Sequence, residues 1–117
     1  MFKEQLTSIL EKVEGAVAAS LVGLDGIEVE RVGDREIPLE TLAAEFGSFV
    51  KSISQAGSDL DAGSVEQFSL VTEKYITFLS SVTTEYFILL VLRAGGNYGR
   101  ARFELAKARF ALRDELS

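Results

Sequence analysis

The most strongly patterned stretch of the chain is an uninterrupted apolar run over residues 86–92. A strand with one wet face alternates apolar and polar residues, so an unbroken apolar run indicates a strand covered on both faces. Such a strand lies in the middle of a sheet that carries helices above and below it. The pattern therefore predicts a central strand at residues 86–92, around which the other elements pack.

Three segments repeat apolar residues at the spacing of an amphipathic helix, namely residues 2–13, 39–55 and 98–116. Asn97 is a suitable N-cap for the last one, which has two apolar faces, one of them containing Phe103 and Phe110. The middle helix has one strongly apolar face and an opposite face of mostly small residues: Ala44, Gly47, Ser48, Lys51, Ser52 and Gln55. That second face is either a solvated surface or a surface shaped for the close approach of another helix, and spacing alone leaves both readings open.

Four further segments have the pattern of strands. Residues 16–22 are small and apolar on both faces and suit a second internal strand, and Asp25-Gly26 after them predicts a type I′ hairpin. Residues 27–30 alternate, which predicts an edge strand with Ile27 and Val29 on its dry face. Residues 65–72 and 75–82 form an antiparallel meander with the central strand. The outer edge of residues 65–72 has no predicted neighbour and is a candidate pairing surface.

Composition narrows the possible functions. The 117 residues, which we expect to form one domain over positions 1–117, include no His and no Cys. This excludes zinc sites of the usual type, thiol nucleophiles and His bases, so we expect no metal and no cofactor. The net charge of −6 argues against nucleic-acid binding. No apolar stretch approaches the length of a membrane span and the start lacks a signal-peptide pattern, so we expect no membrane insertion and a cytoplasmic protein.

No group of residues in the sequence forms a recognisable active site. The glycine cluster before the last helix lacks the spacing of phosphate-binding loops and is better explained by a sharp turn. Arg102, Arg109 and Arg113 form a basic stripe on the last helix; we expect their heads to reach water or acids such as Glu11 and Glu14, although a partner-binding role stays open. Because no nucleophile, base and oxyanion donors come together, we do not expect an enzyme.

The order helix, strand, strand, helix, three strands, helix resembles the roadblock (dynein light-chain) family. Two motifs carry the resemblance: a glycine before the first strand with an Asp-Gly turn after it, and an entry to the last helix of the form N-x-G-x-[AG]-R-x-x-L. The matching residues are Gly15, Asp25, Gly26, Asn97, Gly99 and Arg102. The resemblance implies a three-layer α/β/α fold of the α+β class, similar to profilin and longin domains. Its five-stranded antiparallel sheet has the order 2-1-5-4-3, with helices 1 and 3 on one face and helix 2 on the other.

The same resemblance implies a function in protein binding. Roadblock proteins form homodimers in which the third strands pair edge to edge and the second helices pack together. By that likeness the dimer interface comprises Ala44, Gly47, Ser48, Lys51, Ser52, Gln55, Val65, Gln67, Ser69 and Val71. Bacterial and archaeal members are often associated with small Ras-like GTPases, and the MglB type activates one in signalling. The expectation is therefore a noncatalytic dimeric GTPase regulator; the alternatives are a dimeric scaffold without effect on GTP turnover and a sensor of a small molecule.

Overall fold

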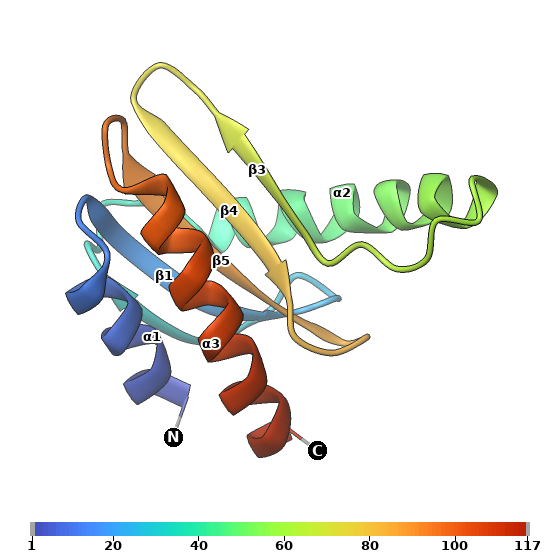
Figure 1. Ribbon diagram of the computed structural model, residues 1–117, viewed down its shortest axis with the longest axis horizontal. Helices are drawn as coiled ribbons and strands as arrows, with labels where there is room; N and C mark the ends of the chain where they lie inside the picture. The colour runs from blue at the N-terminus through green and yellow to red at the C-terminus, as the bar shows by residue number, and fades with distance from the viewer. Residues whose placement is uncertain (1, 117) are drawn as a thin grey trace.

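The computed structural model describes residues 2–116 and has the order of elements that the sequence predicts (Figure 1). Three helices and five strands follow one another along the chain. Their bounds are α1 Phe2–Lys12, β1 Ala16–Gly23, β2 Glu28–Gly33, α2 Leu39–Asp59, β3 Gln67–Val71, β4 Tyr75–Ser81, β5 Tyr86–Arg93 and α3 Tyr98–Leu116.

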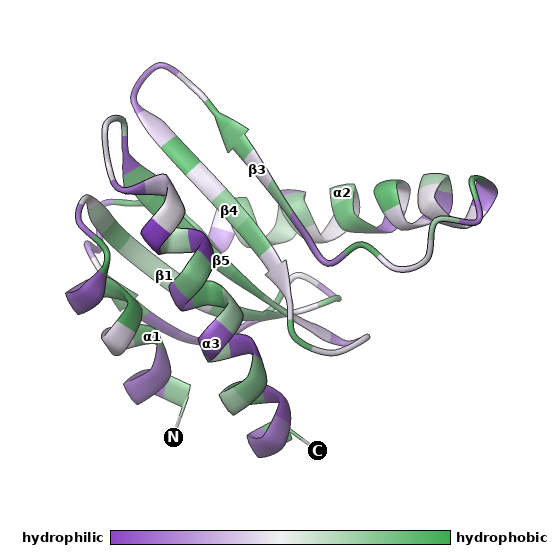
Figure 2. Ribbon diagram, viewed as in Figure 1, coloured by the Kyte–Doolittle hydropathy of each residue, from purple (hydrophilic) through white to green (hydrophobic). Residues whose placement is uncertain are grey.

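The strands form one antiparallel sheet in the order β2-β1-β5-β4-β3, which confirms the predicted topology. Strand β5 is the central strand, and Figure 2 shows that it is hydrophobic along nearly all of its length. Phe87 and Leu89 belong to the core cluster that includes residues of α2, whereas Ile88 and Leu90 belong to the one that includes residues of α1 and α3. The apolar run therefore contributes side chains to the core on each face of the sheet, as its pattern predicts.

Helices cover both faces of the sheet. Helices α1 and α3 lie side by side on one face, where α1 contributes Leu6 and Ile9 to the core and α3 contributes Leu105 and Leu112 (Figure 1). Helix α2 covers the opposite face and buries Ala43 and other residues against β1, β4 and β5. The three-layer arrangement implied by the resemblance is confirmed.

The hairpin between β1 and β2 differs from the predicted type I′ turn. Gly26 has φ +87°, but Asp25 keeps a negative φ, and the amide of Gly26 donates to the carbonyl of Gly23 at 2.9 Å. The side chain of Asp25 accepts the Ile27 amide at 3.0 Å. Residues 24–26 thus form a three-residue hairpin loop in which only Gly26 has a positive φ. The prediction of two positive φ angles was wrong because only Gly26 adopts one, and the Asp25 side chain closes the turn by accepting the Ile27 amide.

The facing of β2 also differs from the prediction. Ile27 and Val29 are 66% and 47% exposed, whereas Glu28 and Glu30 are only half-exposed. The register between β1 and β2 shifts at Leu21/Val22, so a bulge interrupts the regular alternation at this point. The alternating pattern assigned Ile27 and Val29 to the dry face, and that assignment was wrong because a bulge resets which residues face the core.

Helix α2 is longer than its pattern predicts. The sequence places Gly57 in a loop, yet the helix continues to Asp59 and closes when the Leu60 amide donates to the Ala56 carbonyl at 3.1 Å. Its second half extends beyond the sheet, past the edge formed by β3 (Figure 1). Strand β3 is shorter than predicted and begins at Gln67 rather than Val65. The structure therefore leaves an overhanging helix beside a short edge strand.

Asn97 caps α3 as predicted, since its side-chain oxygen accepts the Arg100 amide at 3.0 Å. Replacing Asn97 with Ala removes that acceptor and is expected to lower the free energy of unfolding by about 1 kcal/mol. Thermal unfolding should then shift down by about 4 °C. Asn97→Ser keeps a capping oxygen and should melt close to the parent. Equal losses for the two variants would show that the cap does not carry the effect.

Candidate functional site

The two edge strands of the sheet differ in charge. Strand β2 contains Glu28, Glu30 and Arg31, whereas β3 has no charged residue between Gln67 and Val71. Charged side chains on an edge strand discourage pairing with another chain, and an edge without them is open to it. Strand β3 pairs only with β4 in the sheet. The charges on β2 therefore disfavour pairing of that edge with another chain, whereas the β3 edge is available for it.

An aromatic cluster joins β3 to α2. The ring of Phe68 lies edge to face with those of Phe46 and Phe49, at centroid distances of 6.1 Å and 5.2 Å. Phe49 nevertheless remains 48% exposed, and Leu70 and Val71 on β3 are 47% and 67% exposed. Large apolar side chains thus line the free edge of the sheet and the adjacent side of the helix. Exposed apolar side chains of this size are typical of an interaction surface.

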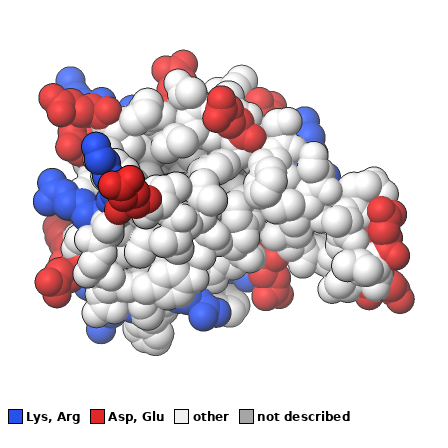
Figure 3. Space-filling view, turned by 90° about the horizontal axis from the view of Figure 1, so that it is seen from above, with Lys and Arg blue, Asp and Glu red and all other residues white. Residues whose placement is uncertain are grey.

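The overhanging half of α2 is nearly free of charge. Between Glu45 and Asp59 the helix carries one charged side chain, Lys51. In Figure 3 acidic side chains gather at the tip of the projecting part, and the surface where it joins the body is largely uncharged. Depletion of charge at the centre with charge at the rim is the composition of protein interfaces. The second half of α2 and the β3 edge together are called the β3–α2 surface below.

Five of the six α2 residues named from the sequence are exposed: Ala44, Ser48, Lys51, Ser52 and Gln55. Gly47 is buried instead, because it packs against the turn between β1 and β2. A Cβ on Gly47 would lie 3.4 Å from the carbonyl oxygen of Leu24 and 3.5 Å from Gly26 Cα. Its small size serves the fold, and its placement on the outer face of the helix was wrong. The helical projection missed this contact because the turn approaches α2 from the side.

The β3 residues named from the sequence fall into three environments. Gln67 and Ser69 are half-buried on the side of α3, where the Ser69 hydroxyl lies 2.7 Å from that of Tyr98. Val71 is exposed at the end of the strand. Val65 precedes the strand, and its carbonyl accepts the Ser81 hydroxyl at 2.9 Å. The sequence prediction of the surface missed three exposed apolar residues, Phe49, Leu60 and Leu70. It placed Phe49 on the apolar face of the helix, put Leu70 on the same face of its strand as Phe68, and gave Leu60 no role.

The family-motif residues shape the ends of elements. Gly15 follows α1 at φ +89°, and Gly26 and Asp25 make the first turn as described above. Asn97 is the cap of α3, while Gly99 lies exposed in its first turn. Arg102 is also exposed on that helix. Gly15, Asp25, Gly26 and Asn97 therefore have structural roles at turns and at the helix cap.

Arg109 and Arg113 do not reach the acids proposed for them. Arg109 lies 4.0 Å from the carboxylate of Glu66, before β3, and not beside Glu11 or Glu14 of α1. Arg113 donates from Nε to the Val82 carbonyl at 3.1 Å. Both arginines turn toward the β3–β4 side of α3 and help to hold the end of the sheet.

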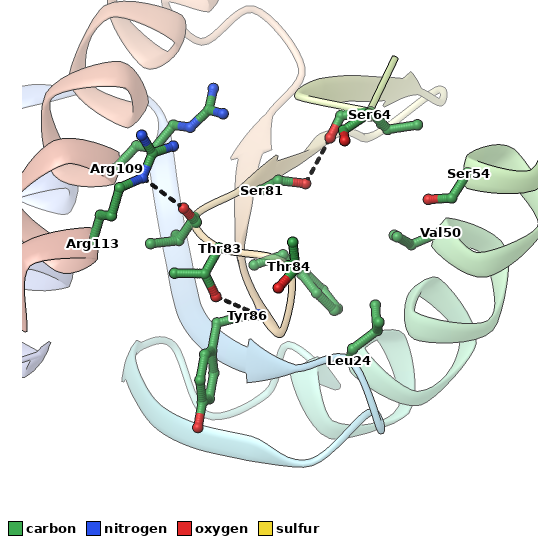
Figure 4. A pocket seen from close by; sticks show the side chains of 13 residues that line it. Leu24, Val50, Ser54, Ser64, Ser81, Thr83, Thr84, Tyr86, Arg109 and Arg113 are labelled. Atoms are coloured by element: carbon green, nitrogen blue, oxygen red, sulfur yellow. Dashed lines mark hydrogen bonds between the residues drawn. The ribbon is translucent and has the colours of Figure 1, made fainter. Parts of the chain in front are cut away.

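A cavity of about 630 Å³ lies at that end of the sheet, between α2 and α3 (Figure 4). Its polar groups are mostly used in holding the chain: the Ser81 hydroxyl and Arg113 bond to carbonyls, and Thr83 accepts the Tyr86 amide at 3.2 Å. No base and nucleophile lie together among its lining residues. The residues that line it are Leu24, Val50, Ser54, Ser64, Val65, Ser81, Val82, Thr83, Thr84, Tyr86, Phe87, Arg109 and Arg113.

Metal and membrane sites were sought over residues 2–116. In this part of the chain no group of acidic side chains lies close enough together to hold a metal ion. None of the helices described there is both long and apolar enough to cross a membrane. The β3–α2 surface thus stands as the candidate functional site.

The comparisons with known proteins agree with this geometry. A family model described as Roadblock/LC7 domain matches residues 2–93, which leaves α3 and its N-x-G-x-[AG]-R-x-x-L entry outside the match. No curated protein matches the chain.

Several solved structures share the fold. MglC from Myxococcus xanthus is 32% identical, with a TM-score of 0.70 over 97% of this chain and 98% of that one. A Roadblock/LC7 domain from Streptomyces avermitilis has a TM-score of 0.88 at 18% identity, covering 97% of this chain and 95% of that one. MglB from Myxococcus xanthus has a TM-score of 0.91 at 14% identity, covering 98% and 94%. By sequence identity the chain is more similar to MglC than to MglB, whereas by superposition of the fold it is more similar to MglB.

Proposed function

This chain belongs to the Roadblock/LC7 family, and from that premise we propose that it is a noncatalytic homodimeric regulator of a small Ras-like GTPase. The observation that carries the proposal is the β3–α2 surface, an uncharged edge strand beside an overhanging, nearly uncharged helix. A surface of that kind matches a second copy of itself.

The dimer that we propose has twofold symmetry. Two β3 strands pair antiparallel across the axis, so that two five-stranded sheets become one. The overhanging half of each α2 then covers the sheet of the other copy, and the two helices pack through Ser48, Ser52 and their neighbours. Exposed Phe49, Leu70 and Val71 lose their contact with water in this arrangement.

The regulatory step that we propose uses no chemistry from this chain. The cavity lining described above has no nucleophile and base together, so an effect on GTP hydrolysis would come from holding the GTPase in one switch-loop conformation. A binding protein shifts such an equilibrium only by its differential affinity for the two conformations. The paired α2 helices provide a preformed, rigid surface for that selection.

Single-turnover GTP hydrolysis tests the proposal. A Ras-like GTPase encoded beside this chain is loaded with GTP, and its hydrolysis rate is measured with increasing amounts of this protein. We expect a saturable change of at least about tenfold, which corresponds to about 1.4 kcal/mol in the barrier. A dimer-breaking variant, described in the Discussion, should lose the effect.

Two other results are informative. A complex with unchanged hydrolysis would make the protein a dimeric scaffold and would overturn the regulatory step. Absence of a complex with the GTPase in either nucleotide state, at concentrations of about 100 μM, would overturn the partner assignment itself.

A further inference from the structure

Helix α3 presents two exposed aromatic rings to solvent. Phe103 is 56% and Phe110 is 67% exposed, and their spacing of seven positions puts them on one face, about 10 Å apart along the axis. The opposite face of the helix is the buried one, formed by Ala101, Glu104, Leu105, Ala108 and Leu112. The two rings therefore contribute little to the core, and they lie on the face of the sheet opposite to α2.

Cations flank these rings. The guanidinium of Arg100 lies 5.6 Å and the ammonium of Lys107 5.5 Å from the centroid of Phe103. The guanidinium of Arg113 lies 5.9 Å from the centroid of Phe110. Each contact is within the range of a cation–π interaction.

A buried carboxylate fixes two of the cations. Glu104 is 3% exposed, and its oxygens lie 3.5 Å from Arg100 Nη2 and 3.4 Å from Lys107 Nζ. Because Glu104 is held in the core face of α3, it holds the two cations on either side of the exposed ring. The basic and aromatic groups are thus positioned before any partner arrives, which reduces the entropy lost on binding.

The charge of α3 is opposite to that of the chain. Between Tyr98 and Arg113 the helix has five cationic side chains and one carboxylate, and that carboxylate is the buried Glu104. The rest of the chain has seven cationic and seventeen acidic side chains. Arg100 and Lys107 thus widen the basic stripe of Arg102, Arg109 and Arg113 on α3. With the two exposed rings, this face of an acidic protein is complementary to a surface that is acidic and apolar.

We propose that the exposed face of α3 around Phe103 and Phe110 docks an acidic amphipathic helix of a partner protein. Apolar side chains of that helix would cover the two rings, and its carboxylates would pair with Arg100, Arg102 and Lys107. The proposal does not depend on the GTPase or on the packing of α2, which covers the opposite face of the sheet (Figure 1). Strand β3, in contrast, lies beside α3, where the Ser69 hydroxyl is 2.7 Å from that of Tyr98.

The neighbourhood of α3 favours a helix over an anionic membrane. Helix α1 lies beside α3 in the same layer and exposes Glu4 and Glu11, and Asp114 and Glu115 follow the basic stripe on α3 itself (Figure 1). A flat anionic surface would meet those carboxylates together with the arginines. A single helix aligned with α3 contacts the basic stripe and leaves α1 uncovered.

The test uses the full chain and a synthetic, fluorescently labelled peptide. The peptide is an amphipathic helix of about four turns, with leucines on one face and glutamates beside them. A second peptide has lysine in place of each glutamate. We expect the acidic peptide to bind and the basic peptide not to bind. NMR chemical-shift changes on binding should be confined to the amides of residues 100–113. The affinity for the acidic peptide should fall at least about tenfold when the salt concentration rises from about 0.05 M to about 0.5 M.

Matched variants locate the site. Phe110→Ser is expected to weaken binding at least about tenfold, whereas Ile27→Ser, at an apolar residue of equal exposure elsewhere, leaves it unchanged. Arg102→Glu is expected to weaken binding by a similar factor, whereas the same change at Arg35, exposed in the loop after β2, has no effect. All four positions are exposed, so the fold tolerates the changes, and circular dichroism verifies it.

Three results would overturn the proposal. They are equal binding of the acidic and basic peptides, equal effects of the matched variants, and no binding of the acidic peptide at about 1 mM. Vesicles containing phosphatidylserine serve as a further arm. Binding to these vesicles that Phe110→Ser abolishes, without binding of the acidic peptide, would assign the face to a membrane instead.

Discussion

Gly33→Ala is expected to unfold the domain at temperatures where the parent is stable, with a loss of about 2–5 kcal/mol. Gly33 ends β2 at φ +101°, a conformation that L side chains rarely adopt. A Cβ at this position would overlap the carbonyl oxygen of Val17 and lie 2.7 Å from Ala18 Cα. Both obstacles are backbone atoms of an internal strand, so no side-chain rotation relieves them.

Gly95→Ala is the matched control for that prediction. Gly95 has φ +86°, and a Cβ there meets nothing within 4 Å. This variant measures the cost of the left-handed backbone alone, about 1–2 kcal/mol. The melting temperature should fall by about 10–20 °C for Gly33→Ala and by about 4–8 °C for Gly95→Ala. Equal shifts for the two variants would contradict the close packing at Gly33.

Val71→Lys combined with Ser48→Arg is expected to convert the proposed dimer into monomers. Both residues are exposed, so the isolated fold should tolerate the changes. A lysine on the β3 edge discourages pairing, and a long side chain at Ser48 separates the α2 helices. Because each substitution enters a twofold interface twice, we expect the dimer dissociation constant to rise at least about 100-fold, a change of about 2.7 kcal/mol.

Sedimentation equilibrium and the hydrolysis assay provide the readouts for that variant. Ile27→Lys changes an equally exposed apolar residue beside the opposite edge of the sheet and should leave the dimer intact. A double variant that stays dimeric would count against the β3–α2 surface. A parent that is monomeric at about 100 μM would remove the dimer itself. Gly47→Arg is unsuitable for this test because Gly47 contacts the turn of its own chain.

The elements best predicted from the sequence are those whose signal is local and strong. The apolar run 86–92 fixed the central strand because only burial on both faces explains it. Asn97 was identified as a cap from its residue type and position, and the strand order followed from a resemblance to a family of known topology. The central strand and the helix cap depend on short stretches of sequence, whereas the strand order depends on the resemblance.

The errors concern packing between elements distant in sequence. A helical projection does not show that Gly47 touches the turn at Gly26. An alternating strand pattern does not show where a bulge interrupts it, and so it does not predict that Ile27 is exposed. The overhang of α2 had a signal that a length argument could have found. A helix of 21 residues is about 31 Å long. The three strand spacings from β1 to β3 cover only about 15 Å.

The contact of Gly26 and Gly47 has a mechanical consequence. A Cβ on Gly26 would lie 3.0 Å from Ala44 Cα, so the turn and the helix meet backbone to backbone. No flexible side chain lies between them to absorb a displacement. A side chain added at Gly26 would therefore push the turn away from the helix and disturb both elements together.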